Sequence, residues 1–352
     1  MPSELRRIRP GSPARLLLAV VSAALLGGAV GFGQAQSAPA PTPRAQSVKA
    51  TTTPGTGATF SVQAVPLPAG FQHAFALALN NKGQVLFVAH KGAEARANDS
   101  DVLHLWTGGT PKALTLPRGF KTGELASSVG RSCLADDGRI VMNTFSEQAA
   151  LLYSGGRFTP ITFPNTDIFI QNCAPDLSAV ASDLNTGQSY LWQPATGEVL
   201  EGNFEGVNDI NRAGQFVADT HLQRSEGTYS VNQQQWQPKF INDAGLILGE
   251  DVAGDGASLY LWPKADKQPS QVARPAGTDA VFPQDLNEKG QALVGYLNDQ
   301  FIYTHVTRTY RPIRVDGWTL QVVLALNEQG WVLAQATQTG QKAVRTVLLK
   351  PK

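Results

Sequence analysis

Two aspartates, Asp209 and Asp285, are the side chains of this sequence best suited to acid–base chemistry. Each stands five residues before a glycine, Gly214 or Gly290, in a recurring motif. Two carboxylates at one channel could act as a general acid and a general base, as in enzymes that cleave polysaccharides. The competing role is structural, because an Asp just before an Asn turn often caps the local backbone. The sequence favours the structural role and makes the two aspartates weak catalytic candidates.

Cys133 and Cys173 are the only cysteines of the chain, and a disulfide between them is expected. Each stands five residues before the glycine position of its repeat, with Ser178 taking that position in the later copy. Equal positions in consecutive repeats are spatial neighbours, and the leader described below implies an oxidising compartment. The alternative is a pair of small buried thiols held too far apart to bond.

Other chemical signatures are missing from the sequence. The five histidines have no metal-ligand spacing, and no Gly-rich phosphate loop, Gly-x-Ser-x-Gly elbow or His-Glu-x-x-His helix is present. We therefore expect no metal and no cofactor, and the sequence favours a protein that is not an enzyme.

The elements that position these residues are turns that recur seven times. The copies read LNNKGQVL, LADDGRIV, APDLSAVA, INRAGQFV, INDAGLIL, LNEKGQAL and LNEQGWVL. An Asn at the first turn position can bond the backbone two residues on, and a Gly at the fourth can take the left-handed conformation that leads into a strand. Each copy predicts a β-hairpin. The turn residues are Asn80 and Gly83, Asn211 and Gly214, Asn242 and Gly245, Asn287 and Gly290, and Asn327 and Gly330.

The spacing of the repeats predicts an all-β propeller. Successive glycine positions are 55, 40, 36, 31, 45 and 40 residues apart, close to the length of a four-stranded propeller blade. Two strands at 59–67 and 73–79 and two at 331–336 and 344–349 would complete one blade from both ends of the chain, which removes exposed sheet edges. Seven blades are favoured. The interval between Gly214 and Gly245 is so short that a three-stranded blade or a total of six blades is the alternative.

The turns and strand endings resemble the exported repeat proteins named for a His-Ala-Phe tripeptide, the HAF-repeat family. Gly249 and Gly295 after their strands, and the endings Leu-His-Leu-Trp106 and Leu-Tyr-Leu-Trp262, match the pattern of that family over about residues 60–349. The literal His-Ala-Phe at 73–75 is out of register with it. The resemblance implies export and a repeat fold, and it implies no particular chemistry.

The first 58 residues differ in composition from the rest. Residues 1–35 combine an Arg-rich start, a 15-residue apolar stretch and a small-residue cleavage site, which predicts a signal peptide and no membrane span in the mature chain. Residues 36–58 predict a disordered Ala/Pro/Thr linker, and residues 59–350 the propeller. Removal of the leader takes away four Arg and one Glu and changes the formal charge from +1 to −2 (+1 minus +3). The net charge of the mature chain therefore does not favour binding to nucleic acid.

The function predicted from these features is that of an exported, periplasmic or extracellular, non-catalytic scaffold. Propellers place function on variable loops, so we expect loops such as Lys91–Asp101 and the channel mouth to bind a protein or glycan partner. The alternatives are a polysaccharide hydrolase or lyase with carboxylates at the channel mouth, and a building block of the cell envelope.

Overall fold

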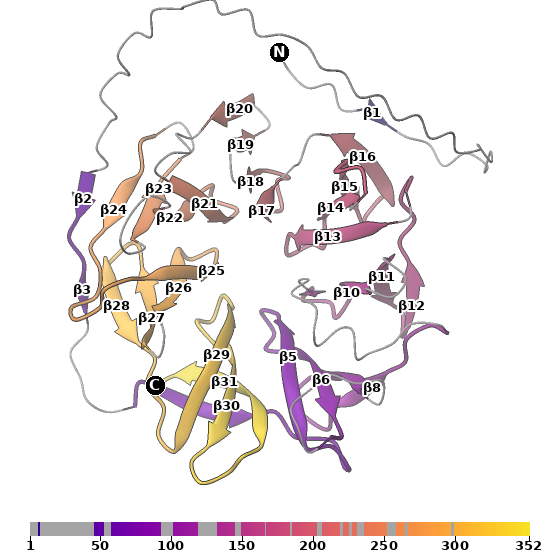
Figure 1. The fold of residues 1–352 in the computed structure, drawn as a ribbon, viewed down its shortest axis with the longest axis horizontal. Coiled ribbons are helices and arrows are strands. Elements are labelled where there is room, and N and C mark those ends of the chain that lie inside the picture. The colour runs from indigo at the N-terminus through magenta and orange to yellow at the C-terminus, as the bar shows by residue number, and fades with distance from the viewer. Residues whose placement is uncertain are drawn as a thin grey trace, which may run out of the picture.

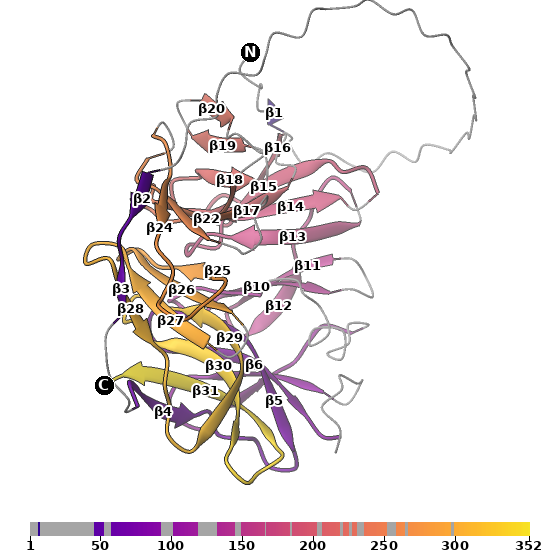
Figure 2. The same ribbon diagram turned by 60° about the vertical axis from the view of Figure 1, so that its left-hand side comes forward.

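The computed structural model shows an all-β protein. It describes residues 6–7, 46–52, 58–92, 101–118, 132–144, 149–165, 167–183, 185–202, 206–218, 221–224, 227–230, 236–251, 258–264, 267–296 and 299–352. Every regular element among these residues is a β-strand, and the strands form seven sheets. The sheets are arranged around a central axis as the blades of a β-propeller (Figures 1 and 2).

The blades follow the chain in order, with the first strand of each nearest the axis. Blade 1 contains β5 (His73–Leu79), β6 (Val85–His90), β7 (Val102–Trp106) and β8 (Lys112–Leu114). Blade 2 contains β9 (Cys133–Leu134), β10 (Ile140–Thr144), β11 (Ala149–Ser154) and β12 (Arg157–Pro160). Blade 3 contains β13 (Ile168–Cys173), β14 (Ala179–Asp183), β15 (Ser189–Gln193) and β16 (Glu198–Gly202). Blade 4 contains β17 (Val207–Ile210), β18 (Phe216–Ala218), β19 (His221–Arg224) and β20 (Gly227–Ser230).

The remaining three blades complete the ring. Blade 5 contains β21 (Trp236–Ile241), β22 (Ile247–Asp251), β23 (Leu259–Trp262) and β24 (Ser270–Val272). Blade 6 contains β25 (Phe282–Leu286), β26 (Gln291–Tyr296), β27 (Asp299–Thr304) and β28 (Thr309–Pro312). Blade 7 contains β29 (Trp318–Leu326), β30 (Val332–Gln338), β31 (Val344–Pro351) and, from the other end of the chain, β4 (Phe60–Ala64).

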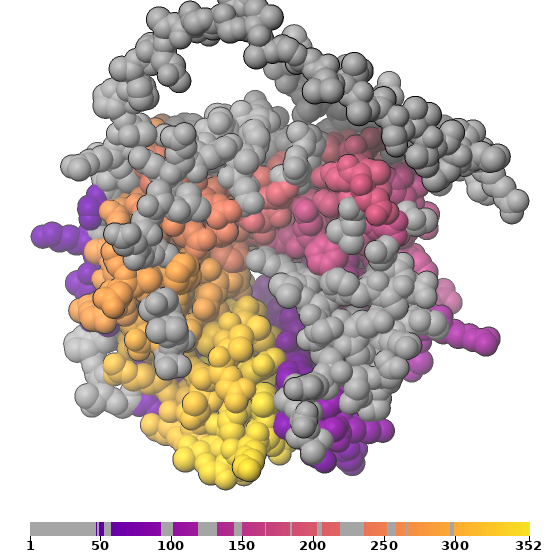
Figure 3. Space-filling view, in the orientation of Figure 1, coloured from indigo at the N-terminus to yellow at the C-terminus, as the bar shows by residue number. Residues whose placement is uncertain are grey.

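The two ends of the chain share blade 7, as the sequence predicted. β4 pairs antiparallel with β31, with Phe60 opposite Pro351 and Ala64 opposite Val347. Figure 2 shows β4 beside β31, and in Figure 3 the yellow surface of blade 7 borders the purple surface of blade 1, which closes the ring. The division of strands differs from the prediction, since three come from the C-terminal end and one from the N-terminal end. The reason is that the strand before each Asn turn pairs with the strand after it, so β5 begins blade 1 and does not complete blade 7.

Blade 4 corrects the expectation raised by the shortest repeat interval. Its four strands have only three or four residues each, so the short interval from Gly214 to Gly245 does not cost the blade a strand. The short interval is accommodated by shorter strands and not by fewer strands.

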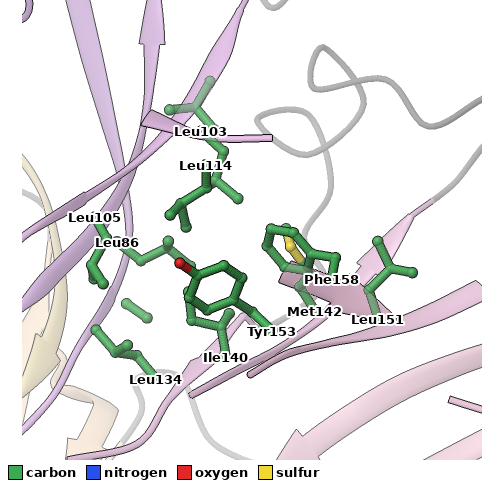
Figure 4. Packing of buried hydrophobic residues seen from close by; sticks show 12 residues of the cluster. Leu86, Leu103, Leu105, Leu114, Leu134, Ile140, Met142, Leu151, Tyr153 and Phe158 are labelled. Atoms are coloured by element: carbon green, nitrogen blue, oxygen red, sulfur yellow. The ribbon is translucent and has the colours of Figure 1, made fainter. Parts of the chain in front are cut away.

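Apolar side chains between neighbouring blades form the core. Figure 4 shows one such layer, in which Leu86 and Leu103 of blade 1 meet Ile140 and Met142 of blade 2, all with no exposed surface. Burying such side chains contributes about 2 kcal/mol each. The aromatic residues at or next to the ends of the third strands are also buried. They therefore pack between blades and do not form an exposed platform on which sugars could stack. They include Trp106, Trp192, Trp262 and Tyr303.

Short strands precede the propeller proper. β1 (Arg6–Arg7) pairs with β16, and the rest of the predicted leader, residues 1–35, lies outside the described residues. Within the predicted linker, β2 (Gln46–Val48) pairs parallel with β24, and β3 (Thr51–Thr52) pairs parallel with β28. Part of this segment therefore extends the outer edges of blades 5 and 6. Among the described residues, no helix has the length and apolar character needed to cross a bilayer.

Candidate functional site

Each Asn turn joins the first and second strands of one blade, beside the channel. In each turn the Asn side-chain oxygen accepts from backbone N–H groups, as at Asn80, where the N–H groups of Lys82 and Gln84 donate to Oδ1 over 3.1 and 2.9 Å. The following Gly has a positive φ, 74° at Gly83. These local bonds agree with the turn predicted from the sequence.

The amide nitrogen of the same Asn side chain makes a second contact, which the sequence did not predict. It donates to the backbone carbonyl at the equivalent position of the next blade, over 2.8 to 3.2 Å. We call this set of bonds the Asn ring. It runs from Asn211 to Asn242, Asn287, Asn327, Asn80 and finally Ala135. The side-chain links stop at Ala135 and Ala174, because an alanine at these positions has no amide group.

A second set of hydrogen bonds links neighbouring blades at the mouth of the channel. These bonds are made by the residue that follows the Asn position of the turn. The carboxylate of one blade accepts from the backbone N–H of the preceding blade, as between Asp243 N and Glu288 Oε2 at 2.6 Å and between Glu288 N and Glu328 Oε1 at 2.8 Å. Asp136 accepts in the same way from Asn81 N at 2.8 Å. Acidic side chains therefore gather at this mouth.

Asp209 and Asp285 lie in the channel wall, and both link their own blade to neighbouring blades. Asp209 Oδ2 accepts from the backbone N–H of Ile241 at 2.9 Å, and Asp285 Oδ2 accepts from that of Leu326 at 2.7 Å. Their other oxygens accept from Asn172 Nδ2 at 2.6 Å and from Leu286 N at 2.8 Å respectively. The two aspartates belong to blades 4 and 6, with blade 5 between them. Their geometry is that of blade-to-blade links.

Cys133 and Cys173 form a disulfide between blades 2 and 3, with Cα atoms 6.1 Å apart. Their positions are not equivalent, which corrects the alignment made from sequence. Leu177, and not Ser178, takes the glycine position of the third turn, with φ 74° and its N–H donating to Ala174 O. Cys173 is therefore one residue further along its strand than Cys133.

This offset explains why the sulfurs meet. Cys133 occupies the same repeat position as Asp209 and Asp285, and each of these three side chains reaches the residue just before the turn of the next blade: Cys173, Ile241 and Leu326. The disulfide also stands where the Asn ring has no side-chain link. The disulfide thus joins blades 2 and 3, one of the two neighbouring pairs of blades that lack the side-chain hydrogen bond of the Asn ring; blades 3 and 4 are the other pair.

The channel contains a cavity of about 310 Å³. Among the described residues that line it, five carry carboxylates and none is Lys, Arg or His. Gln284 also lines the cavity, and its Oε1 is buried without a hydrogen-bond partner in the described part of the chain. The carboxylates are contributed by four blades, through Asp136, Asp209, Asp285, Glu288 and Glu328.

Glu288 is a lining carboxylate whose pKa is raised, mainly by burial. Burial raises the pKa of Glu288 to about 7, with further contributions from the nearby carboxylates of Asp243 and Glu328. The hydrogen bond from Asp243 N and the charge of Arg212 act in the opposite direction. Arg212 itself contacts Asp243, with Nη1 3.2 Å from Oδ2.

Three of the five histidines, His73, His90 and His104, lie in blade 1. His73 and His90 are opposite each other on β5 and β6, and His90 Nδ1 lies 2.5 Å from Asp101 Oδ1 with both side chains buried. Asp101 carried no signal in the sequence, because an Asp before a strand is common. Of the loop Lys91–Asp101, residues 93–100 are outside the described part. No group of three or more His, Cys, Asp and Glu side chains in the described residues is arranged to hold a metal ion.

Comparisons with known proteins establish the fold alone. No protein-family model and no curated protein matches this sequence. Among solved structures, a virginiamycin B lyase from Staphylococcus aureus superposes with a TM-score of 0.53 at 11% identity, covering 83% of this chain and 100% of that one. The protein YCF48 bound to D1 peptide gives 0.52 at 9% identity, over 86% and 99%. The extracellular domain of a hybrid two component system from B. thetaiotaomicron gives 0.51 at 14% identity, over 84% and 40%.

Proposed function

We propose that this protein is an exported, non-catalytic propeller that binds a partner at the mouth of its channel. The observation that carries the proposal is the use of Asp209 and Asp285. Each accepts a backbone N–H of the next blade at 2.7 to 2.9 Å, which supports a role in linking the blades over the role of an acid and base pair. The cavity is then a rigid, preformed recess, the usual form of a binding site.

Export is supported by the predicted leader, by the resemblance to HAF-repeat proteins and by the disulfide, since disulfides persist in oxidising compartments. YCF48, a structure of similar fold, was determined with a bound D1 peptide, and another structure of similar fold is an extracellular domain. The fold is thus compatible with the proposed periplasmic or extracellular binding role, with a protein or glycan as partner. The polysaccharide hydrolase or lyase is the second candidate, because carboxylates do border the channel.

Site-specific photo-cross-linking tests this function. A photoreactive residue replaces Lys289, which is exposed beside Glu288, and a control residue replaces Asp316, whose side chain is 82% exposed away from the channel. We expect the mouth position to cross-link a protein from the native envelope that the control position does not, or a glycan array to give a defined signal. Identical cross-links from both positions together with a featureless array would refute the proposal. Release of sugar ends that stops in Asp209→Asn/Asp285→Asn would establish the second candidate.

A further inference from the structure

Residues 46–52 form an N-terminal belt along the outer edges of two blades. β2 pairs parallel with β24 of blade 5, with Val48 opposite Val272, and β3 pairs parallel with β28 of blade 6. The N–H of Thr51 donates to the carbonyl of Arg308 at 3.0 Å. The belt therefore occupies backbone groups that an outermost strand otherwise presents to water or to another chain.

Side chains alternate along the belt between exposed and partly buried positions. Lys49 and Thr51 are exposed, Ala50 and Thr52 are partly buried, and Ala50 packs against the apolar cluster between blades 5 and 6. Strand pairing fixes the direction and spacing of a bound segment, whereas its side chains set the specificity. The same edges can therefore accept another extended segment of suitable composition.

Three positively charged residues flank the step of the belt from blade 5 to blade 6. Lys49 lies between β2 and β3, Arg274 comes two residues after the end of β24, and Arg308 directly precedes β28. All three are exposed, and within the described part of the chain none of them forms an ion pair. Arg274 donates to the backbone carbonyl of Asp279. The belt thus places a lysine where the surrounding charges favour a carboxylate.

We propose that the outer edges of blades 5 and 6 are a docking surface for an extended acidic segment of a partner protein, and that the belt occupies this surface as a built-in competitor. The partner segment is a peptide, because pairing with a strand edge requires backbone N–H and C=O groups. It is acidic at the position of Lys49, because a negative charge there complements Arg274 and Arg308. This surface is separate from the channel mouth and goes beyond the function proposed above.

The covalent connection makes the belt an effective competitor. A tethered segment is present at an effective concentration on the order of mM, so a free peptide of similar affinity binds poorly while the belt is docked. Release of the belt, or better charge complementarity in the partner, opens the surface.

Fluorescence polarisation with labelled peptides tests the proposal on the full mature chain. One peptide is Gln-Ser-Val-Glu-Ala-Thr-Thr, the belt sequence with Glu at the position of Lys49, and the other retains Lys. Thr51→Pro removes the N–H that donates to Arg308 O and should release the belt. We expect this variant to bind the Glu peptide about tenfold or more tightly than the wild type does. At low ionic strength it should bind the Glu peptide about threefold more tightly than the Lys peptide.

Charge variants in the Thr51→Pro background place the preference on the two arginines. Arg274→Gln/Arg308→Gln should bind the Glu and Lys peptides equally, because the backbone pairing remains and the charge preference is lost. The matched control, Lys82→Gln/Lys342→Gln, removes two exposed positive charges outside blades 5 and 6 and should keep the preference.

Hydrogen exchange of the belt gives a second readout that requires no added peptide and covers a Thr51→Pro protein that does not fold. Lys49→Glu should slow exchange of the Thr51 amide about threefold, because the belt then carries the favoured charge. The control Lys342→Glu, at an exposed turn of blade 7, should leave this exchange unchanged.

Three results would overturn the inference. They are binding of neither peptide by the released chain, equal binding of both peptides, and exchange of the Thr51 amide in Lys49→Glu that is no slower than in the wild type. Cross-linking from position 289 reports on the channel mouth independently, so failure of this inference is distinguishable from failure of the proposed function.

Discussion

Replacement of Asp285 by alanine should destabilise the propeller without any effect on a chemical step. The side chain accepts from Leu326 N at 2.7 Å in the next blade and from Leu286 N at 2.8 Å in its own strand. A hydrogen bond to a charged group contributes about 1.5–3 kcal/mol. Because both N–H groups lie near the channel cavity, where water can partly replace the carboxylate, the lower value applies to each, or about 3 kcal/mol in total.

Thermal unfolding followed by near-UV circular dichroism measures this loss. For a domain of this size each kcal/mol corresponds to about 2 °C, so Asp285→Ala should lower the melting temperature by about 6 °C. Asp285→Asn retains one acceptor and should lower it by about half as much. The control Asp316→Ala, at an exposed position, should change stability by less than about 0.5 kcal/mol. An Asp285→Ala protein that melts like the wild type would refute the structural role assigned to this carboxylate.

Three further predictions follow from the same contacts. Cys133→Ser/Cys173→Ser should lose about 4 kcal/mol, the chain-entropy value for cysteines 40 residues apart, and dithiothreitol should lower the melting temperature of the wild type but not of this variant. Asn327→Ala removes the hydrogen bond from the side-chain amide to Asn80 O and should lower the free energy of unfolding, measured in urea, by about 1–2 kcal/mol. The control Asn185→Ala, in an outer hairpin, should lower it by less. Because the folded-state pKa of Glu288 is raised to about 7, its contribution to stability is complete below about pH 4.5 and is lost as the pH rises through 7. Glu288→Gln should therefore melt higher relative to the wild type at pH 8 than at pH 5, and the reverse order would contradict this explanation.

Much of the architecture could be predicted from the sequence because its causes are local and repeated. An Asn and a Gly three residues apart specify the turn through bonds within five residues, as at Asn80, whatever the surroundings. Repetition of that turn at blade-length intervals indicated the propeller, and incomplete units at both ends indicated the closure seen between β4 and β31.

The candidate site depended on contacts between residues 31 to 55 positions apart, which local patterns do not encode. The sequence placed Asp209 and Asp285 at equivalent positions, but only the fold showed that each carboxylate is held by the next blade. The third turn shows the same limit. Leu177 adopts the left-handed conformation that glycine usually takes, and it therefore occupies the glycine position of this turn. The alignment that placed Ser178 there was displaced by one residue.

The sequence by itself thus determined the turns, the repeat and the ring, because backbone conformation and apolar periodicity act over a few residues. Tertiary structure alone decided which side chains link the blades. It also brought Cys133 against Cys173, which is one residue further along its repeat, and it placed five carboxylates from four blades around one cavity. The physical reason is that hydrogen-bond and charge partners are selected by distances of about 3 Å in space, and these are set only when neighbouring blades pack.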